Sequence, residues 1–493
     1  MPDLDPDEFR RLGHAFVDWV ADHRARITDH DVQPAVEPGS VRRLLTDGAL
    51  AGGLPETPQP LEELLRTVDE VVVPASTLWQ HPGFFGYFPA NASLASLLGE
   101  LLSGGLGAQG MLWSTSPAAT EVEQVLLDGF ARALGIGEAF TFDGGGGGSI
   151  QDSASSAALV ALLAALERAG GGAWRESGTD GRERVYVTAE THSSLAKAVR
   201  VAGLGARALR VVEPVPGTVS MSPDALAAAV AADIAAGLRP VMVCATVGTT
   251  GTGAVDPVRA VAAVAAAHDV WVHVDAAWAG VAGLCPELRH VLDGCELADS
   301  FCTDAHKWLL TAFDASLLWV RDATALPRAL SITPEYLRNA ASESGAVVDY
   351  RDWQVPLGRR FRALKLWAVV HGLGLDGLRA HLRGHVAMAV DLAAKVRAEP
   401  GLVLAAPPSL ALVCLRADTG RGPEADDAAT RTLVERVNAS GSAFVTHTVV
   451  DGRYVMRIAI GAVTTQPEHV AALWQRIRAD SAALRREPVQ PTA

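Results

Sequence analysis

Residues 270–278 read VWVHVDAAW, a short apolar run that ends at Asp275 and two alanines. Further runs typical of strands occur on both sides of it, at 185–187, 209–212, 240–245, 301–303 and 316–320. Most of them are separated by helical stretches, such as 223–236 and 257–268. Apolar strands that alternate with helices predict an α/β fold with a mainly parallel sheet, covered by helices on both faces.

Two chemically useful side chains directly follow such strands. Asp275 follows the strand 270–274, and Lys307, in the sequence DAHKW (304–308), follows the strand 301–303. Because ligands bind beyond the carboxyl ends of parallel strands, the two side chains are expected to share a site. Lys307 is one of four lysines among 42 basic residues. An amine forms an imine with an aldehyde, whereas a guanidinium stays protonated.

A carboxylate that faces a pyridine nitrogen keeps this nitrogen protonated and makes the ring a better electron sink. Asp275 and Lys307 together therefore predict a pyridoxal phosphate site. The alternatives are a helix-capping role for Asp275 and a solvated lysine at 307. The apolar neighbours Trp308, Leu309 and Leu310 argue against the second alternative.

A glycine run precedes the predicted sheet. Residues 144–155 read GGGGGSIQDSAS, and a helical run follows at 156–169. Glycines let the backbone approach an anion, and a helix start offers unpaired amides. Ser153 and Ser155 are expected to add hydroxyl donors. The alternative is a flexible linker that ends in a helix cap, since the run lacks the Gly-Lys-Ser/Thr ending of a nucleotide P-loop.

Three further polar residues remain ambiguous from the sequence alone. His192 follows the strand 185–187, where an imidazole can stack on a cofactor ring or relay a proton. A purely structural histidine is the alternative. Thr246 follows the strand 240–245, and His306 precedes Lys307.

The composition limits the class of protein. With 493 residues we expect two or three domains, and the net charge of −14 argues against a nucleic-acid partner. Five cysteines without CxxC spacing indicate a reducing compartment and no metal site. The acidic start and the lack of a bilayer-length apolar stretch favour a cytoplasmic protein without a membrane partner.

The pattern along the chain predicts three segments. Residues 1–102 form an N-terminal helical arm with an amphipathic opening helix around Phe9–Val20, which must pack on something else. Residues 103–373 form the large domain with the predicted sheet. Residues 374–493 form a small α+β domain with helices near 381–398, 427–438 and 467–484.

Taken in order, the motifs of the chain resemble one family. They occupy 84–89 (FFGYFP), 113–117 (WSTSP), 150–155 (IQDSAS), 191–194 (THSS), 245–250 (ATVGTT), 273–280 (HVDAAWAG), 306–308 (HKW) and 353–361 (WQVPLGRRF). From about residue 61 to residue 482 the chain resembles the aromatic-L-amino-acid decarboxylases, which are pyridoxal-phosphate-dependent group II decarboxylases. The resemblance implies a fold-type I, aspartate aminotransferase-like large domain with a seven-stranded sheet, and a homodimer with shared active sites.

The resemblance also implies roles for individual residues. Lys307 would bind the cofactor covalently, Asp275 would pair with the pyridine nitrogen, and His192 and Ala277 would pack on opposite faces of the ring. The other residues implied at the cofactor are Ser153, Ala154, Ser155, Thr246, Asp304 and His306. The implied substrate residues are Trp79, Phe84, Tyr87, Phe88, Ala90, Met111, Trp113 and Gly358.

In the resembled family, a tyrosine on a mobile loop is the presumed proton donor to Cα, and this implies the same role for Tyr336 in the segment 331–348. Relatives with phenylalanine there make arylacetaldehydes, so a tyrosine favours decarboxylation to the amine. The aromatic residues at 79, 84, 88 and 113 indicate an aromatic substrate, although core packing is their alternative role.

Gly358 leaves space where histidine-specific relatives carry serine. Three departures from the animal enzymes leave the substrate class open. Asp304 replaces asparagine, Ala90 replaces threonine, and Met111 replaces phenylalanine. Tryptophan, 5-hydroxytryptophan, DOPA, tyrosine and phenylalanine stay open, and so do glutamate-type and diaminobutyrate-type substrates. A cofactor-free scaffold is the remote alternative.

Overall fold

The computed structural model describes residues 3–332 and 346–486 and divides into two compact units. The smaller unit contains the chain up to Pro89, the segment Ala394–Ala405 and the chain from Leu415 onward. The larger unit contains Ala90–Ala393 and Ala406–Cys414. Most of the predicted N-terminal arm therefore belongs to the same unit as most of the predicted C-terminal domain.

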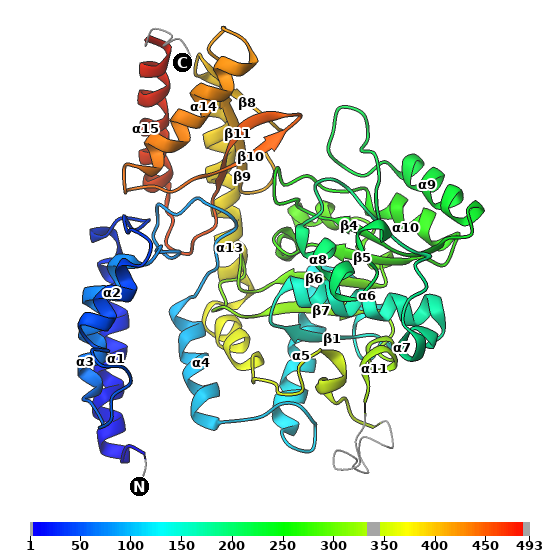
Figure 1. Cartoon of the computed structure of the whole chain (residues 1–493), viewed down its shortest axis with the longest axis horizontal. Helices are drawn as coiled ribbons and strands as arrows, with labels where there is room; N and C mark the ends of the chain where they lie inside the picture. Colours follow the sequence, from blue (N-terminus) through cyan, green and yellow to red (C-terminus); the bar gives the residue numbers. More distant parts are fainter. Residues whose placement is uncertain (1–2, 333–345, 487–493) are drawn as a thin grey trace. The chain divides into compact units, whose positions relative to one another are not determined.

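The larger unit is built on a seven-stranded sheet in the order β1-β7-β6-β5-β4-β2-β3 (Figure 1). The strands are β1 (Gly147–Gln151), β2 (Glu183–Val187), β3 (Leu209–Val211), β4 (Arg239–Thr246), β5 (Trp271–Asp275), β6 (Ser300–Asp304) and β7 (Ser316–Val320). Only β7 is antiparallel to its neighbours β1 and β6. The predicted α/β fold with a mainly parallel seven-stranded sheet is confirmed.

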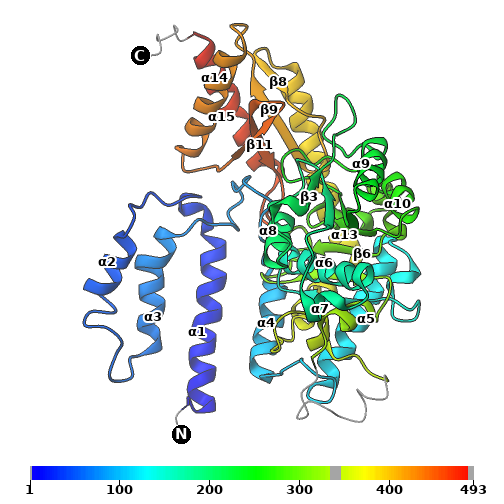
Figure 2. The same ribbon diagram turned by 45° about the vertical axis from the view of Figure 1, so that its right-hand side comes forward.

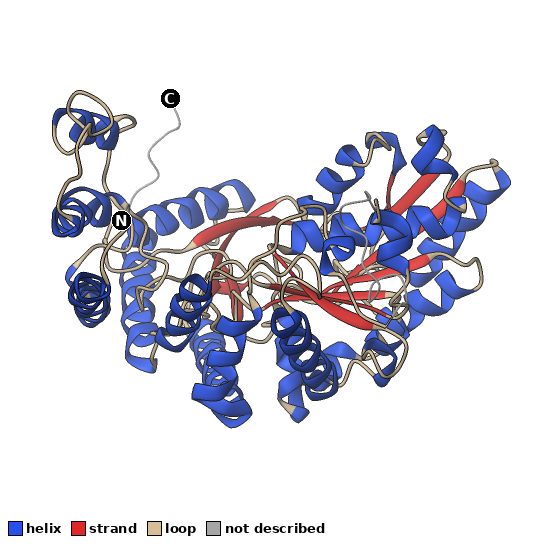
Figure 3. Ribbon diagram, turned by 90° about the horizontal axis from the view of Figure 1, so that it is seen from below, coloured by secondary structure: helices blue, strands red, loops and turns tan. Residues whose placement is uncertain are grey.

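Helices cover both faces of this sheet, and strands and helices alternate along much of the chain (Figure 3). The helices are α4 (Leu94–Leu106), α5 (Pro117–Leu134), α6 (Ala154–Gly170), α7 (Ala173–Ser177), α8 (Ser193–Val201), α9 (Pro223–Ala235), α10 (Val258–Ala266), α11 (Ala325–Leu330) and α13 (Ala363–Ala398). Helix α13 contains a non-helical residue at Gly374, and its last residues belong to the smaller unit.

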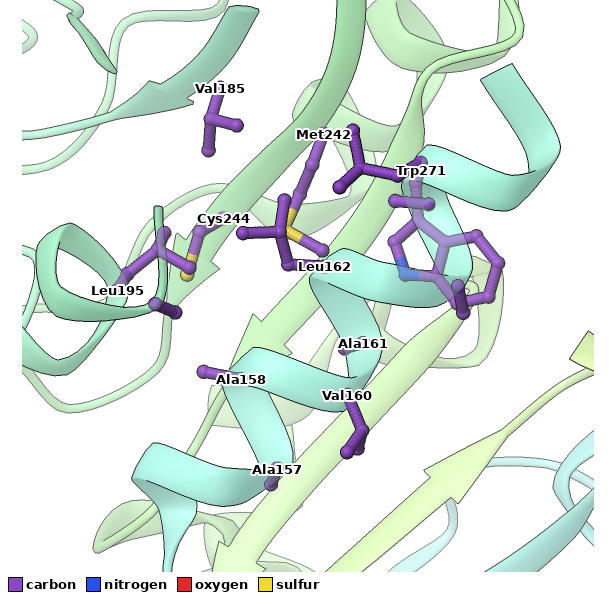
Figure 4. Close-up of a cluster of buried hydrophobic side chains, with 14 of the residues drawn as sticks. Ala157, Ala158, Val160, Ala161, Leu162, Val185, Leu195, Met242, Cys244 and Trp271 are labelled. Carbon is purple, nitrogen blue, oxygen red and sulfur yellow. The ribbon is translucent and has the colours of Figure 1, made fainter. Parts of the chain in front are cut away.

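Helix α6 covers the central part of one face of the sheet. Its small residues, among them Ala157, Ala158 and Ala161, form a buried cluster with Met242, Cys244 and Trp271 of the strands, as Figure 4 shows. Because alanine has no bulk beyond Cβ, the helix lies close to the strands and its first turn reaches the edge at which β4, β5 and β6 end.

The glycine run contains a strand that the sequence did not predict. Residues 147–151 form strand β1, which pairs with β7. A Cβ atom on Gly148 would lie 2.9 Å from side-chain atoms of both Leu127 and Trp319, and one on Gly147 would lie 2.5 Å from the ring of Phe142. These two glycines are therefore required for close packing, and only the end of the run, at residues 153–155, begins a helix.

The smaller unit contains the opening helices and a four-stranded sheet in the order β10-β11-β9-β8. Its strands are β8 (Leu402–Leu404), β9 (Leu412–Ala417), β10 (Thr446–Val450) and β11 (Arg453–Ala459), and β9 begins in the larger unit. Its helices are α1 (Pro6–Ala25), α2 (Ser40–Asp47), α3 (Leu61–Thr67), α14 (Pro423–Asn438) and α15 (Pro467–Arg486). The helices predicted near 427–438 and 467–484 are α14 and α15, and the helix predicted near 381–398 is the second part of α13.

The predicted amphipathic opening helix is α1, which lies beside α3 (Figure 2). Asp5 caps α1 by accepting hydrogen bonds from the amides of Asp7 and Glu8. Leu12 is the only buried residue of α1, whereas Phe9 is 57% exposed. Across the described residues, no helix combines the length and the apolar character needed to cross a membrane.

Candidate active site

Three polar side chains end three adjacent parallel strands of the larger unit. Thr246 ends β4, Asp275 ends β5 and Asp304 ends β6. Thr246 lies opposite Asp275 in the β4–β5 ladder, and Asp275 lies opposite Cys302 in the β5–β6 ladder. Since side chains alternate along a strand, all three lie on the face that α6 covers. Lys307 follows Asp304 by three residues, so the expected shared site of Asp275 and Lys307 lies at this edge.

Lys307 makes an ion pair with a buried carboxylate. Its Nζ lies 2.8 Å from Oδ2 of Asp304, and its side chain is 25% exposed. Burial lowers the pKa of the Lys307 ammonium, but the charge and hydrogen bond of Asp304, together with the charge of Asp275, outweigh burial, and the pKa lies above its ordinary value. Burial likewise raises the pKa of Asp304, but Lys307 and His306 outweigh it and the pKa is lowered. The pair is therefore ionised at neutral pH.

The backbone around Lys307 is held by a residue that the sequence reasoning did not identify. The side-chain amide of Asn91 donates to the carbonyl oxygen of Lys307 over 2.6 Å. The backbone amide of Asn91 donates to the carbonyl oxygen of His306 over 2.7 Å. Asn91 is buried. No signal in the sequence linked it to a lysine more than two hundred residues later.

The other three lysines lie elsewhere. Lys365 of α13 is completely buried, with its Nζ 3.2 Å from Oε2 of Glu100. Lys197 is exposed on α8, and Lys395 lies near the end of α13. Lys307 is thus the one lysine that directly follows the carboxyl end of a parallel strand.

Asp275 is 8% exposed, and its surroundings supply only part of the hydrogen bonds that a carboxylate can accept. Its Oδ1 accepts a hydrogen bond from the amide of Ala277 over 3.1 Å and lies 4.0 Å from the thiol of Cys302. Within the described chain, no cation pairs with this carboxylate. Ala276 is buried, while Ala277 is partly exposed and presents a small side chain next to the carboxylate.

Two histidines are oriented by hydrogen bonds to their Nδ1 atoms. His192 is exposed and caps α8: its Nδ1 accepts from the amide of Ser194 over 3.2 Å and lies 2.8 Å from Oγ of the same residue. His306 is buried, and its Nδ1 accepts from the amide of Ala315 over 3.1 Å. Burial lowers the pKa of His306, whose Nε2 lies 3.5 Å from Oδ2 of Asp304.

Ser153, Ala154 and Ser155 form the start of α6. Ser153 is the N-cap, and its Oγ accepts from the amide of Ser156 over 3.3 Å. The first amides of a helix have no acceptor within it, and its positive dipole end attracts anions. The start of this 17-residue helix is therefore suited to a phosphate group.

Several buried oxygens at the sheet edge have no hydrogen-bond partner within the described residues, among them Oγ1 of Thr246, Oδ1 of Asp304 and Oγ of Ser316. Buried polar atoms are rarely left unpaired, so such atoms call for a ligand or water. Together with an amine, a carboxylate that no cation balances and a helix start, they fit a group that carries an aldehyde, a ring nitrogen and a phosphate. Pyridoxal phosphate has this set of groups.

The implied substrate residues are divided between the two units. In the smaller unit, Phe84 is completely buried against Val32 and Phe444, and Phe88 is buried with Arg457 over its ring, 4.3 Å from the ring centre. Core packing, the alternative role, thus accounts for the positions of Phe84 and Phe88. Trp79 and Tyr87 are 36% and 52% exposed, and their rings stack on each other.

In the larger unit, Trp113 lines an open pocket of about 660 Å³ together with Phe142 and Val348. Its indole nitrogen donates to Glu121 over 2.8 Å. Gly358 is exposed, Ala90 and Met111 are partly exposed, and Tyr336 lies outside the described residues. The substrate-binding roles of these residues stay predictions.

Comparisons with known proteins agree with this chemistry. Residues 38–418 match the family described as "Pyridoxal-dependent decarboxylase conserved domain". The chain is 43% identical to tyrosine decarboxylase 4 of Petroselinum crispum, over 98% of this chain and 95% of the relative. It is also 43% identical to phenylacetaldehyde synthase of Arabidopsis thaliana, over 98% of this chain and 97% of the relative.

The structure is similar to the crystal structure of Oryza sativa TDC with PLP and tryptamine. The TM-score is 0.92 and the identity is 41%, and the match covers 98% of this chain and 99% of that one. The chain therefore belongs to the pyridoxal-dependent decarboxylase family and is an amino-acid decarboxylase that uses pyridoxal phosphate.

Proposed function

We propose that this enzyme converts an aromatic L-amino acid into the corresponding amine and carbon dioxide. The observation that carries the proposal is the placement of Lys307 and Asp275 at one sheet edge of a chain that is 43% identical to a tyrosine decarboxylase over nearly its full length. The similarity to a structure that contains tryptamine supports an aromatic substrate as well.

Pyridoxal phosphate supplies a ring that takes up the electron pair released when the bond between Cα and the carboxylate breaks. Lys307 would hold the cofactor through its amine, and Asp275 would hold a proton at the ring nitrogen. His192, with its ring fixed by Ser194, would stack on one face of the cofactor. The small side chain of Ala277 would leave room for the opposite face.

The remaining implied cofactor residues would bind the polar groups of the cofactor. Ser153, Ala154 and Ser155 would hold the phosphate at the start of α6. Thr246 carries a buried hydroxyl without a partner in the described structure. Asp304, supported by His306, would keep the amine of Lys307 protonated whenever it is free of the cofactor.

We assign proton delivery to Cα to Tyr336, a residue beyond the described part of the chain. A phenol within reach of Cα would complete the conversion to the amine by general acid catalysis. The implied substrate pocket comprises Trp79, Phe84, Tyr87, Phe88, Ala90, Met111, Trp113 and Gly358.

The test is a substrate panel on the enzyme with bound cofactor. Carbon dioxide and amine are measured with tyrosine, DOPA, phenylalanine, tryptophan, 5-hydroxytryptophan, glutamate and 2,4-diaminobutyrate as single substrates. The expected result is amine and carbon dioxide in equal amounts from one or more of the aromatic substrates. Turnover of glutamate or diaminobutyrate alone would overturn the proposed substrate class.

Aldehyde formation is the second candidate, because a phenylacetaldehyde synthase is as similar in sequence as the tyrosine decarboxylase. That reaction consumes oxygen and water, and it would release aldehyde, carbon dioxide, ammonia and hydrogen peroxide in place of amine and carbon dioxide. We expect amine from the unaltered enzyme and a shift toward aldehyde in Tyr336→Phe. An unchanged amine yield in this variant would remove Tyr336 from its assigned role.

We also propose that the enzyme is a homodimer in the cytoplasm. Helix α4 carries an exposed stripe of leucines, each at least half exposed: Leu94, Leu98, Leu102 and Leu106. Their spacing of four residues places them along one side of the helix, where a second subunit would cover them. Sedimentation at several protein concentrations measures the oligomeric state. All five cysteines are buried thiols, which suits a reducing compartment.

A further inference from the structure

Four buried polar side chains lie behind Asp275 on the face that α6 covers. Trp271 and His273 precede Asp275 at alternate positions of β5, and Ser300 and Cys302 occupy the neighbouring positions of β6. Each of them is at most 3% exposed. Trp271 and Cys302 belong to the buried cluster that the alanines of α6 form on this face, and Figure 4 shows Trp271 among them. Such a line of polar groups in an apolar layer is costly unless every proton finds an acceptor.

The side chains contact each other in one continuous series. The indole nitrogen of Trp271 donates to Oγ of Ser300 over 2.8 Å, and this oxygen lies 2.8 Å from Nδ1 of His273. Nε2 of His273 lies 3.9 Å from Sγ of Cys302. The thiol of Cys302 lies 4.0 Å from Oδ1 of Asp275. The series therefore ends at the carboxylate assigned to the cofactor nitrogen.

The chemistry of the groups sets the direction of the protons. Because an indole can only donate, Ser300 accepts from Trp271 and keeps its own proton for Nδ1 of His273. His273 then carries its proton on Nε2, which points at Cys302, and the thiol donates to Asp275. In the opposite tautomer, the proton of Ser300 would have no acceptor within the series. Within the series, only the first arrangement gives every donor an acceptor.

The protonation states of His273 and Cys302 agree with this direction of proton donation. Burial lowers the pKa of His273 to about 4, although the charge of Asp275 opposes the shift. Burial raises the pKa of the Cys302 thiol, and the charge of Asp275 raises it further. At neutral pH the imidazole is therefore uncharged and the thiol is protonated, so both are able to donate.

We infer that Ser300, His273 and Cys302 are positioning residues, whose aligned protons stabilise the negative charge on Asp275 and thereby favour a protonated cofactor nitrogen. The inference rests on the proposed role of Asp275. Donors to a carboxylate favour its ionised form. Without them the proton between Asp275 and the ring nitrogen shifts toward the carboxylate, and the ring becomes a weaker electron sink.

The first test is a measurement on the unaltered enzyme, with one variant used only to assign the signal. Side-chain nitrogen resonances of the unaltered enzyme, labelled with ¹⁵N-histidine and assigned with a His273→Gln variant, report which ring nitrogen of His273 carries the proton. We expect the proton on Nε2. A proton on Nδ1 would reverse the series and overturn the inference, whatever the role of Asp275.

The second test measures the cofactor nitrogen itself, by solid-state NMR of the enzyme loaded with ¹⁵N-pyridoxal phosphate. In Cys302→Ala the resonance is expected to move toward the unprotonated position. The kcat should fall about threefold to tenfold, as for loss of one hydrogen bond of ordinary strength, while KM stays within about twofold. Cys302→Ser keeps a donor and should restore the resonance. Cys295→Ala, which removes a buried thiol at a distant 3₁₀ turn, is the matched control.

An unchanged resonance in Cys302→Ala would overturn the inference, and so would an equal loss in the alanine and serine variants, since this would indicate a packing effect. Asp275→Asn separates the inference from the proposal on which it rests. If this variant leaves the nitrogen resonance unchanged, the proposed role of Asp275 has failed. If it shifts the resonance and Cys302→Ala does not, only the series of protons has failed.

Discussion

The end of the central sheet and the surface of α4 both carry side chains in an unfavourable environment, but the side chains are of opposite polarity. At the sheet edge, polar atoms such as Oγ1 of Thr246 are buried and lack partners in the described structure. On α4, apolar side chains such as Leu98, which is 58% exposed, face outward. Buried polar atoms call for a polar ligand, whereas exposed apolar groups call for an apolar cover. The first region suits the cofactor, and the second suits the second subunit that we propose.

The largest effect is expected at the sheet edge, from Lys307→Ala. Without the amine, turnover should fall by more than about 10³-fold, the scale seen when a covalent catalytic side chain is removed. Borohydride reduction of the loaded enzyme should no longer attach the cofactor to the chain. Lys197→Ala on α8 is the control and should retain both properties. Cofactor attachment in the 307 variant would place the chemistry at another lysine.

At α4, charged substitutions should separate the proposed subunits. Burying one leucine contributes roughly 2 kcal/mol, and each substitution counts twice in a twofold interface. Leu98→Asp combined with Leu102→Asp should therefore raise the dissociation constant more than about 100-fold. Sedimentation measures this directly. Val201→Asp on α8, where the native valine is 64% exposed, should leave the dimer intact. A dimer that survives the double substitution would assign the leucines to another role.

The charge balance at the sheet edge should depend on Asp304. This carboxylate raises the pKa of Lys307, so Asp304→Asn should lower it and increase the fraction of neutral amine at a given pH. The rate at which the apo-enzyme captures pyridoxal phosphate should then rise at neutral pH, and its pH profile should move to lower pH. Stopped-flow absorbance measures this profile. An unshifted profile would show that Asp304 does not control the amine.

The smallest effect should have opposite signs in the two forms of the enzyme. Thr246→Val removes a buried hydroxyl without a partner in the described structure, which should stabilise the apo-enzyme by about 1 kcal/mol and weaken cofactor binding by up to about tenfold. Thermal unfolding and cofactor titration measure the two changes. Thr303→Val, at the adjacent position on the opposite face of β6, also removes an unpaired buried hydroxyl and should stabilise without weakening binding. Equal binding losses in both variants would contradict the role of Thr246.

The sequence predicted most strands, because a buried parallel strand reads as a short apolar run. It also placed Asp275 and Lys307 at one edge, since both follow such runs. The sequence did not predict β1, because Gly147 and Gly148 are not typical of a strand. These glycines are required by tertiary packing, since Phe142, Leu127 and Trp319 leave no space for a side chain.

Contacts between distant segments were also beyond the sequence. Asn91 holds the backbone of Lys307, and Phe85 pairs with Phe444 within the smaller unit. Neither contact is indicated by a pattern in the sequence around these residues. The polar series behind Asp275 did leave a signal, since His273 and Asp275 alternate with valines in β5, but the same spacing occurs in ordinary half-buried strands.

The scarcity of lysine has a consequence for how the enzyme acquires its cofactor. Free pyridoxal phosphate is an aldehyde that reacts with any accessible neutral amine, and a surface rich in lysine would compete for it. Here Lys365 is completely buried beside Glu100, and arginines supply nearly all of the remaining positive charge. The chain thus has few other amines with which the aldehyde can react. We expect the enzyme to bind one cofactor per chain, with little reaction at other lysines even when the cofactor is in excess.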